Sequence, residues 1–191
     1  MAVLKGSNTE QNLLAAFAGE SQARNRYTMA GSIAKKEGYE QIRGIFMETA
    51  ENELEHAKVF YKLLEGGEVT ITAGYPAGVP GGTLEQLQAA AAGEKMEWTT
   101  IYTGFADVAD QEGLSAAAIK FRQIAEVEQY HERRFNKLIA AVSAGTVFKR
   151  PEAALWKCRN CGRVMEATDA PEMCPTCDHP KAHFELFAEN Y

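Results

Sequence analysis

The sequence has no cysteine in its first 157 residues, no cluster of basic residues and no long uninterrupted apolar stretch. A membrane-spanning helix needs about 18 or more consecutive apolar residues, so we expect no membrane segment. Residues 1–8 lack the charged-then-apolar layout of a secretion signal, and we therefore expect a cytoplasmic protein. The net charge of -6, from 20 Lys and Arg against 26 Asp and Glu, argues against nucleic acid as a partner.

The composition is that of a globular protein. With 191 residues, 46% hydrophobic and 24% charged, the chain can bury one sizeable core beside a small module, and a fully disordered chain is excluded. The acidic balance favours a small molecule or a protein as the partner.

Four long helices are predicted from capping signals and apolar periodicity. Ser7-x-x-Glu10 and Thr83-x-x-Gln86 are capping boxes, and Gly38 and Gly113 follow helical stretches as stop signals. The predicted helices cover about residues 8–38, 39–64, 83–112 and 114–144. Residues 66–82 contain six glycines with Pro76 and Pro80, which indicates a long crossover between two helical hairpins, the connection used in ferritin-like bundles.

The two predicted hairpins resemble copies of one another. Glu53-x-x-His56 recurs as Glu128-x-x-His131 at an offset of 75, whereas Ala18-Gly19-Glu20 recurs as Ala92-Gly93-Glu94 at an offset of 74, so one residue is inserted in the second copy. Further equivalent pairs are Tyr27 and Tyr102, Glu37 and Glu112, Phe46 and Phe121, Ala50 and Ala125, and Phe60 and Phe135. Such an extended match is not expected by chance.

The duplicated Glu and His side chains predict a two-metal site. Residues three apart share a helix face, so each Glu-x-x-His can present a carboxylate and an imidazole to one ion. The six groups expected to meet near mid-bundle are Glu20, Glu53, His56, Glu94, Glu128 and His131. Mixed carboxylate and imidazole ligands suit iron or manganese better than structural zinc. The alternative is that these side chains are merely satisfied within a metal-free bundle.

Glu97 breaks the symmetry, because its counterpart in the first hairpin is Ala23. Two ferric ions with an oxo bridge carry +4, and five carboxylates bring the total to -1; two ferrous ions with one carboxylate replaced by neutral His56 give 0. We therefore predict that Glu97 and His56 compete for one iron as its redox state changes. Tyr27 and Tyr102 are candidate hydrogen-bond donors to ligating carboxylates, with plain core aromatics as the alternative.

The four cysteines form two Cys-x-x-Cys pairs separated by twelve residues: Cys158, Cys161, Cys174 and Cys177. This spacing suits two knuckles that close one tetrahedral four-thiolate site in a small module, holding either iron or zinc. His179 and His183 are interpreted as surface or packing residues. The predicted division is residues 1–147 for the bundle, 148–154 for a linker and 155–191 for the cysteine module.

These motifs together resemble the rubrerythrin family over essentially the whole length. The resemblance implies a mainly α protein, a ferritin-like four-helix bundle with a C-terminal rubredoxin-like β module. It implies an oxo-bridged diiron centre and a mononuclear iron on the four cysteines, in an enzyme that reduces hydrogen peroxide to water. The implied diiron ligands are Glu20, Glu53, Glu94, Glu97, Glu128 and His131, with His56 as the redox-dependent ligand.

Electrons are expected from outside the chain, since no Gly-x-Gly-x-x-Gly dinucleotide fingerprint is present. The expected donor is a rubredoxin or an NAD(P)H-dependent reductase. His131 lies roughly 20 Å from the end of its helix, so we expect a head-to-tail homodimer in which each module serves the partner's bundle. The alternatives are a ferroxidase or iron-handling ferritin-like protein, a dioxygen reductase, and a non-enzymatic electron carrier or zinc-stabilised binding module.

Overall fold

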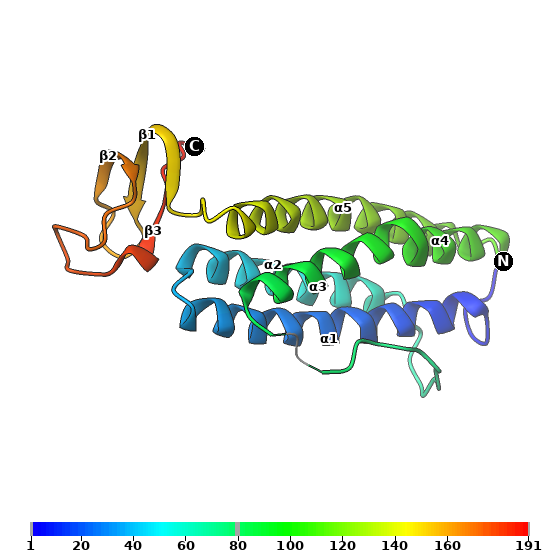
Figure 1. Ribbon diagram of the computed structural model, residues 1–191. Helices are drawn as coiled ribbons and strands as arrows, with labels where there is room; N and C mark the ends of the chain where they lie inside the picture. The colour runs from blue at the N-terminus through cyan, green and yellow to red at the C-terminus, as the bar shows by residue number, and fades with distance from the viewer. Residues whose placement is uncertain (1, 79–80, 191) are drawn as a thin grey trace.

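The computed structural model describes residues 2–78 and 81–190, and it contains a helical bundle followed by a small sheet (Figure 1). The helices are α1 (Asn8–Lys36), α2 (Glu40–Lys62), α3 (Thr83–Met96), the π-helix η1 (Glu97–Ile101), α4 (Tyr102–Gln111) and α5 (Ser115–Ser143). The module contains β1 (Lys149–Cys158), β2 (Val164–Asp169), the short 3-10 helix η2 (Lys181–His183) and β3 (Phe184–Leu186).

The bundle consists of two antiparallel hairpins, as the duplicated sequence predicts. α1 packs along α2, and the broken helix of α3, η1 and α4 packs along α5 (Figure 1). The crossover between the hairpins passes along α1, where the Tyr75 hydroxyl donates to the carbonyl of Ala15 at 2.7 Å. Pro80, part of the predicted loop signal, lies outside the described residues.

The first predicted capping box is confirmed. The Ser7 hydroxyl accepts a hydrogen bond from the Glu10 amide at 3.1 Å, and the Glu10 carboxylate accepts one from the Gly6 amide at 2.8 Å. The second box is wrong, because the N-cap of α3 is Gly82, which has no side chain, and not Thr83. Instead the Glu37 carboxylate accepts from the Thr83 amide at 2.9 Å, so the cap comes from the end of α1.

The third predicted helix is interrupted in its middle. The Tyr102 amide donates to the Glu97 carbonyl, an i to i+5 bond, and η1 therefore contains one residue more than an α-turn would. The prediction of one continuous α-helix over residues 83–112 was wrong at this point. The inserted residue, visible in the sequence as the change of offset from 74 to 75, is accommodated as a π-turn rather than as a shift of the helix ends.

Two aromatic groups fill the core on either side of mid-bundle. Tyr27, Phe46 and Phe135 contact one another with ring centroids 5.3 to 6.1 Å apart. Their counterparts Tyr102, Phe121 and Phe60 do the same at 5.0 to 6.1 Å. Each group takes two rings from one hairpin and one from the other, so the buried rings hold the two hairpins face to face.

The C-terminal module is a three-stranded antiparallel sheet in the order β2-β1-β3. Its small core contains Trp156, Cys158, Cys174 and Phe184, all fully buried or nearly so. β1 begins at Lys149 and so runs through the segment expected to be a linker, while the division into domains stays a prediction. Among the described residues, no helix has the length and apolarity needed to cross a membrane.

Candidate metal centres

Two glutamates, one from each hairpin, lie between both imidazoles at mid-bundle. His56 Nδ1 is 2.8 Å from Glu53 Oε2 and 2.8 Å from Glu128 Oε1. His131 Nδ1 is 2.7 Å from Glu128 Oε2 and 3.3 Å from Glu53 Oε1. Glu53 and Glu128 therefore each direct one oxygen toward each imidazole, which is the arrangement of carboxylates that bridge two ions.

Each imidazole also has a carboxylate of its own. Glu20 Oε1 is 3.9 Å from His56 Nδ1, and Glu94 Oε2 is 3.6 Å from His131 Nδ1. The result is two overlapping groups whose candidate ligand atoms lie within 4.8 Å of one another. They are Glu20, Glu53, His56 and Glu128, and Glu53, Glu94, Glu128 and His131. The shared Glu53 and Glu128 suit a pair of ions rather than two separate sites.

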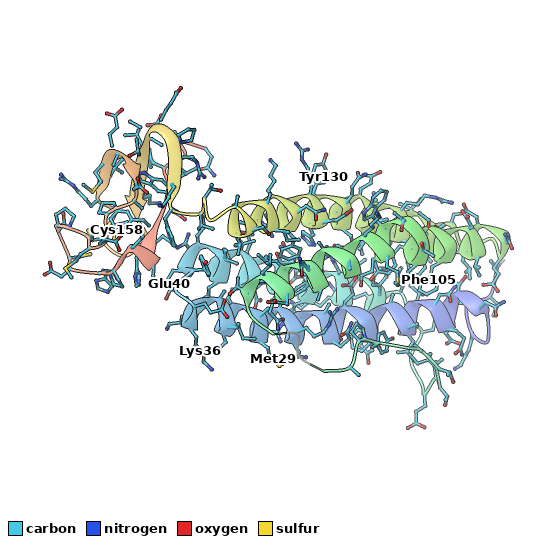
Figure 2. All side chains as sticks on the ribbon, viewed as in Figure 1. Met29, Lys36, Glu40, Phe105, Tyr130 and Cys158 are labelled. Carbon is cyan, nitrogen blue, oxygen red and sulfur yellow. The ribbon has the colours of Figure 1, made fainter. Side chains whose placement is uncertain are left out.

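Helical periodicity selects which side chains enter the cluster. His131 is buried on the inner face of α5, whereas the neighbouring Tyr130 is 66% exposed and points away from the bundle (Figure 2). Glu53 is likewise buried, whereas Glu55 is exposed and pairs with Lys58 at 2.5 Å. Residues on the inner helix faces therefore reach mid-bundle, whereas their neighbours on the outer faces do not.

Each tyrosine donates a hydrogen bond across the hairpins. The Tyr27 hydroxyl binds Glu94 Oε1, and the Tyr102 hydroxyl binds Glu20 Oε1. Both phenols are almost fully buried. Burial raises their pKa values well above the ordinary value for tyrosine, and the negative charges of the nearby carboxylates raise them further. The phenols therefore remain neutral donors that fix the orientation of Glu20 and Glu94.

The buried carboxylates need a positive partner. Glu20, Glu53, Glu94 and Glu128 are each at most 1% exposed. Within the described part of the chain, Glu20 Oε2 and Glu94 Oε2 have no hydrogen-bond partner. Burial and then the neighbouring carboxylates raise the pKa of Glu20 well above its ordinary value, and burial raises the pKa of Glu94 to about 8.

The imidazoles supply part of that positive charge when no ion is present. Burial alone would lower their pKa values, but hydrogen bonds to Glu128 and Glu53 outweigh it and raise the pKa of His56 to about 10 and that of His131 to about 12. Against burial, the same two imidazoles lower the pKa of Glu128 to about 2. Protons thus occupy the positions that cations would take, and the oxygen and nitrogen donors fit iron or manganese.

Glu97 stands apart from both overlapping groups. It is the first residue of η1, it is half-buried, and burial followed by the charge of Glu94 raises its pKa well above the ordinary range. His56, not Glu97, completes the first group in this structure. The sequence singled out Glu97 because its counterpart, Ala23, has no carboxylate. It gave no sign of the large cavity that Glu97 lines.

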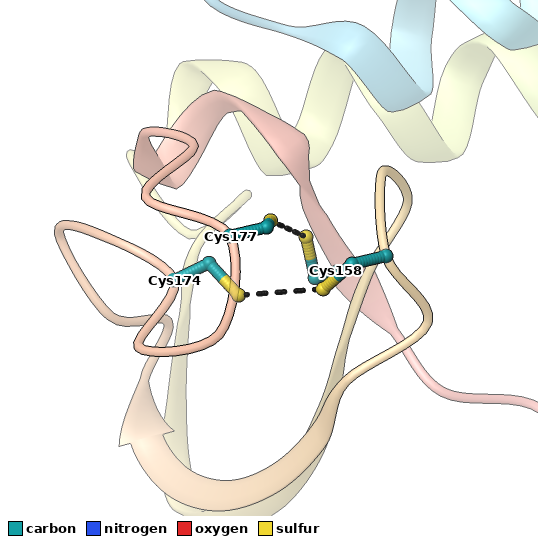
Figure 3. Close-up of side chains that lie close together, drawn as sticks. Cys158, Cys174 and Cys177 are labelled. Carbon is teal, nitrogen blue, oxygen red and sulfur yellow. Dashed lines mark hydrogen bonds between the residues drawn. The ribbon is translucent and has the colours of Figure 1, made fainter.

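The four cysteines form the second centre (Figure 3). The Sγ atoms of Cys158 and Cys177 are 3.8 Å apart, and those of Cys161 and Cys174 are 3.6 Å apart. These separations are too long for disulfides and match the edge of about 3.8 Å expected for a tetrahedron with metal–sulfur bonds of about 2.3 Å. Cys158 and Cys174 are buried, whereas Cys161 is exposed, so one side of the centre faces solvent.

The two histidines near the cysteines belong to the packing around the centre, as predicted. His179 Nδ1 lies 2.9 Å from the carbonyl oxygen of Cys177, and its ring meets that of His183 edge to face at 4.7 Å. The candidate group at this centre contains the four cysteines alone.

Comparison with known proteins agrees with this architecture. The family model described as Rubrerythrin matches residues 11–139, and that described as Rubrerythrin, rubredoxin-like domain matches residues 156–185. The chain is 58% identical to the rubrerythrin of Porphyromonas gingivalis, over 98% of this chain and 94% of the relative. It is 53% identical to the rubrerythrin of Nitratidesulfovibrio vulgaris over the full length of both chains.

Solved structures give the same fold. Fully reduced, all-ferrous nigerythrin superposes with a TM-score of 0.63 at 31% identity, covering 95% of this chain and 87% of that one. A bacterioferritin from Desulfovibrio desulfuricans, at 21% identity and a TM-score of 0.65 over 73% of this chain and 82% of that one, shares the fold of the bundle. The predicted fold class, a ferritin-like bundle with a rubredoxin-like module, is confirmed. A candidate diiron carboxylate site and a four-cysteine site are both present, consistent with two iron centres, and the chain belongs to the rubrerythrin family, which implies an oxidoreductase.

Proposed function

We propose that this protein is a peroxidase that reduces hydrogen peroxide to water at a diiron site, with electrons passed on from a mononuclear iron. The observation that carries the proposal is the pair of buried groups sharing Glu53 and Glu128, in one chain with a four-cysteine centre. The proposed diiron ligands are Glu20, Glu53, His56, Glu94, Glu97, Glu128 and His131. The proposed ligands of the mononuclear iron are Cys158, Cys161, Cys174 and Cys177.

Two ferrous ions bound in the bundle would together supply the two electrons that break one O–O bond. The chain contributes a water-poor pocket of fixed shape. Tyr27 and Tyr102 hold Glu94 and Glu20 in place by hydrogen bonds, and the surrounding aromatic groups keep bulk water away from the carboxylates. Glu20 and Glu94, held in this way, need little reorganisation during a redox cycle.

Glu97 and His56 are proposed to exchange on one iron. In this structure His56 is within hydrogen-bonding reach of Glu53 and Glu128 while Glu97 stands outside the group, which corresponds to the arrangement expected for the reduced site. When the site is oxidised, a negative carboxylate offsets the added positive charge better than a neutral imidazole does. The π-turn at η1 gives Glu97 a backbone position that Ala23, in a regular α-helix, lacks.

Electron delivery is proposed to occur between two copies of the chain. The cysteine module lies beyond the start of α2 and the end of α5 (Figure 1), and Glu53 is 13 residues, roughly 20 Å, from the first residue of α2. A head-to-tail homodimer would place each module beside the partner's diiron site. The exposed side of the four-cysteine centre, at Cys161, would receive electrons from a rubredoxin or an NAD(P)H-dependent reductase.

We also propose a cytoplasmic location. The four thiolates must remain reduced to hold a metal, and none of the cysteines forms a disulfide. A reducing compartment maintains that state.

The test compares Glu97→Ala with Glu55→Ala in the iron-loaded protein. Loss of Glu97 removes a ligand from the oxidised site, so we expect reoxidation of the reduced protein by hydrogen peroxide to slow by about 100-fold. Glu55 is exposed on α2 and pairs only peripherally with Lys58, so its loss should have no effect. Stopped-flow absorbance at the diiron bands measures both rates, and equal rates in the two variants would refute the proposed role of Glu97.

A further inference from the structure

A large cavity lies against the candidate diiron site. It has a volume of about 660 Å³ and is bounded by α1, by residues 73–76 of the crossover, and by α3, η1 and α4. Glu97 and Tyr102 form part of its wall, and Tyr102 hydrogen-bonds to the candidate metal ligand Glu20. Hydrogen peroxide is only slightly larger than water and does not require such a space, whose volume falls in the range of about 300–1,000 Å³ typical of sites for organic ligands.

The walls of this cavity are mostly apolar. Small residues on α1 and α3, among them Ala15, Gly19 and Ala89, leave the space open, and Phe105 and Ile101 add larger apolar surface. Buried polar groups would favour water in this space, whereas apolar walls favour the apolar part of an organic molecule.

The crossover forms a fixed outer wall. Tyr75 is held to α1 by its hydrogen bond to the Ala15 carbonyl, and its ring edge would be 3.6 Å from a Cβ placed on Gly19. A Cβ there would make ordinary van der Waals contact with Tyr75, and a longer side chain would occupy space beside its ring. The absence of a side chain at Gly19 keeps the cavity open between α1 and the crossover.

Arg26 is one polar group of the cavity that lies near Glu97. Arg26 donates a hydrogen bond to Gln22 at 2.6 Å, and both residues line the cavity. The Arg26 guanidinium would be 3.9 Å from a Cβ placed on Gly93, a residue of α3 that lies one turn before Glu97. A ligand can thus place a polar end toward Glu97 and an apolar end along Ile101, Phe105 and Val108. This division is that of an alkyl or aryl hydroperoxide.

Resting on the proposed peroxidase function, we propose that this cavity binds organic hydroperoxides and that the protein reduces them as well as hydrogen peroxide. The O–O bond of ROOH breaks, and two electrons from the reduced diiron site with two protons give ROH and water. The apolar walls would hold the R group, and Glu97 would face the O–O group at the side of the cavity next to the candidate metal ligands. The site therefore selects hydroperoxides by the size and apolarity of R.

Kinetics with cumene hydroperoxide and hydrogen peroxide test this proposal. The second-order rate constants for single-turnover reoxidation of the reduced, iron-loaded protein by the two peroxides should lie within about tenfold of each other. Ala89→Leu fills part of the cavity and should slow cumene hydroperoxide at least about tenfold more than hydrogen peroxide. Gly104→Leu, on α4 at the same cavity, should act in the same direction and serves if Ala89→Leu does not fold. Ala116→Leu, exposed on α5, is the matched control and should leave both rates unchanged.

A binding measurement gives a readout independent of turnover. Calorimetry with 2-phenyl-2-propanol, the alcohol product, should show binding to the oxidised protein that Ala89→Leu weakens about tenfold and Ala116→Leu does not. No binding, as would follow if a second copy of the chain filled the cavity, or an equal loss for both peroxides in Ala89→Leu, would overturn the proposal. Reaction with hydrogen peroxide but not with cumene hydroperoxide refutes this inference alone, whereas reaction with neither refutes the proposed function.

Discussion

The hairpin of α1 and α2 and the hairpin of α3, η1, α4 and α5 bring equivalent side chains to mid-bundle, yet their backbones differ at one turn. α1 continues as an α-helix from Asn8 to Lys36, whereas its counterpart is broken by the π-helix Glu97–Ile101. The carboxylate that has no equivalent in the first half, Glu97, stands at the start of this break. The second half therefore differs from the first in two ways: a glutamate stands at the position of Ala23, and one inserted residue follows it as a π-turn.

The two hairpins make equivalent hydrogen bonds to one another. Tyr27 of the first hairpin binds Glu94 of the second, and Tyr102 of the second binds Glu20 of the first. At the ends of the bundle, Glu37 caps the first turn of α3, and its counterpart Glu112 caps that of α1. Each hairpin thus completes the other, which explains why the two copies preserve residues that do not interact within one hairpin.

The largest effect is expected on the stability of the metal-free protein, because both hairpins contribute buried carboxylates to the same site. Because the pKa of Glu94 rises to about 8 and that of His56 to about 10, the folded metal-free protein binds protons more tightly than the unfolded chain does. That stability is fully present below the unfolded values, about 4.3 for Glu and 6.5 for His, and is lost as the pH rises through the folded ones. We expect the Tm of the chelated protein to fall by about 10 °C or more between pH 5 and 8.

The iron-loaded protein is the control for this measurement. Bound cations replace the protons, so its Tm should change much less over the same pH range. Calorimetric Tm values that decline in parallel for both forms would contradict the interpretation of mid-bundle as a metal site.

Removing the inserted residue should make the backbones of the two hairpins alike while keeping Glu97, and so tests whether the π-turn is needed for the function of Glu97. Deleting Thr99 from η1 allows a regular α-helix and removes the π-turn that begins at Glu97, so peroxide turnover should fall by about 100-fold if Glu97 needs this backbone to reach the metals. The other proposed ligands stay in place, and metal analysis should still find two irons in the bundle. Thr99→Ala keeps the chain length and should retain turnover; a deletion variant as active as Thr99→Ala would show that the π-turn is dispensable.

Tyr27 and Tyr102, which each donate a hydrogen bond to the other hairpin, show whether the two halves contribute equally to stability. Tyr27→Phe and Tyr102→Phe each leave a buried carboxylate oxygen without its donor, which should lower the free energy of unfolding by about 1–3 kcal/mol. Urea unfolding of the loaded protein should give values for the two variants that agree within about 1 kcal/mol. Tyr130→Phe, at an exposed position on α5, should cost nothing measurable. A clearly larger loss in one of the buried variants would show that the halves are not energetically equivalent.

The smallest effects are expected at the helix caps. The Glu112 carboxylate accepts hydrogen bonds from the amides of Asn8 and Thr9 at 3.0 and 2.9 Å, and Glu37 accepts one from Thr83. Glu112→Gln and Glu37→Gln should each lower the free energy of unfolding by about 0.5–1 kcal/mol. Glu126→Gln, exposed on α5, is the control for loss of a charge, and chemical denaturation at pH 7 resolves the difference.

The pH dependence of the Glu112 cap follows from its hydrogen bonds. Those from the Thr9 side chain, and then from the backbone, hold the pKa of Glu112 below its ordinary value. Its contribution is therefore present above about pH 4.3 and is lost as the pH falls through the lower folded value. The difference between wild type and Glu112→Gln should shrink in acid, and a difference that grows in acid would assign the cap another origin.

The sequence by itself determined the four helices, the duplication and the candidate ligands. Apolar residues three or four apart must be buried together, and this periodicity alone places Glu53, His56, Glu128 and His131 on inner helix faces. The cysteine spacing likewise predicts one four-thiolate centre, because two short knuckles can close a tetrahedron without a large core. These features depend on short-range geometry, which a linear pattern contains.

Only the tertiary structure decided the remaining features. The crossed tyrosines, the Glu37 cap of α3 in place of the predicted Thr83 box, and the cavity beside Glu97 all depend on which elements meet across the bundle. The inserted residue was visible in the sequence, but whether it would shift a helix end or form a π-turn depended on buried contacts at Glu94 and Tyr102 that hold both flanking segments in register. Because packing fixes the segments before and after this turn, the backbone accommodates the extra residue between them, in the π-helix that begins at Glu97.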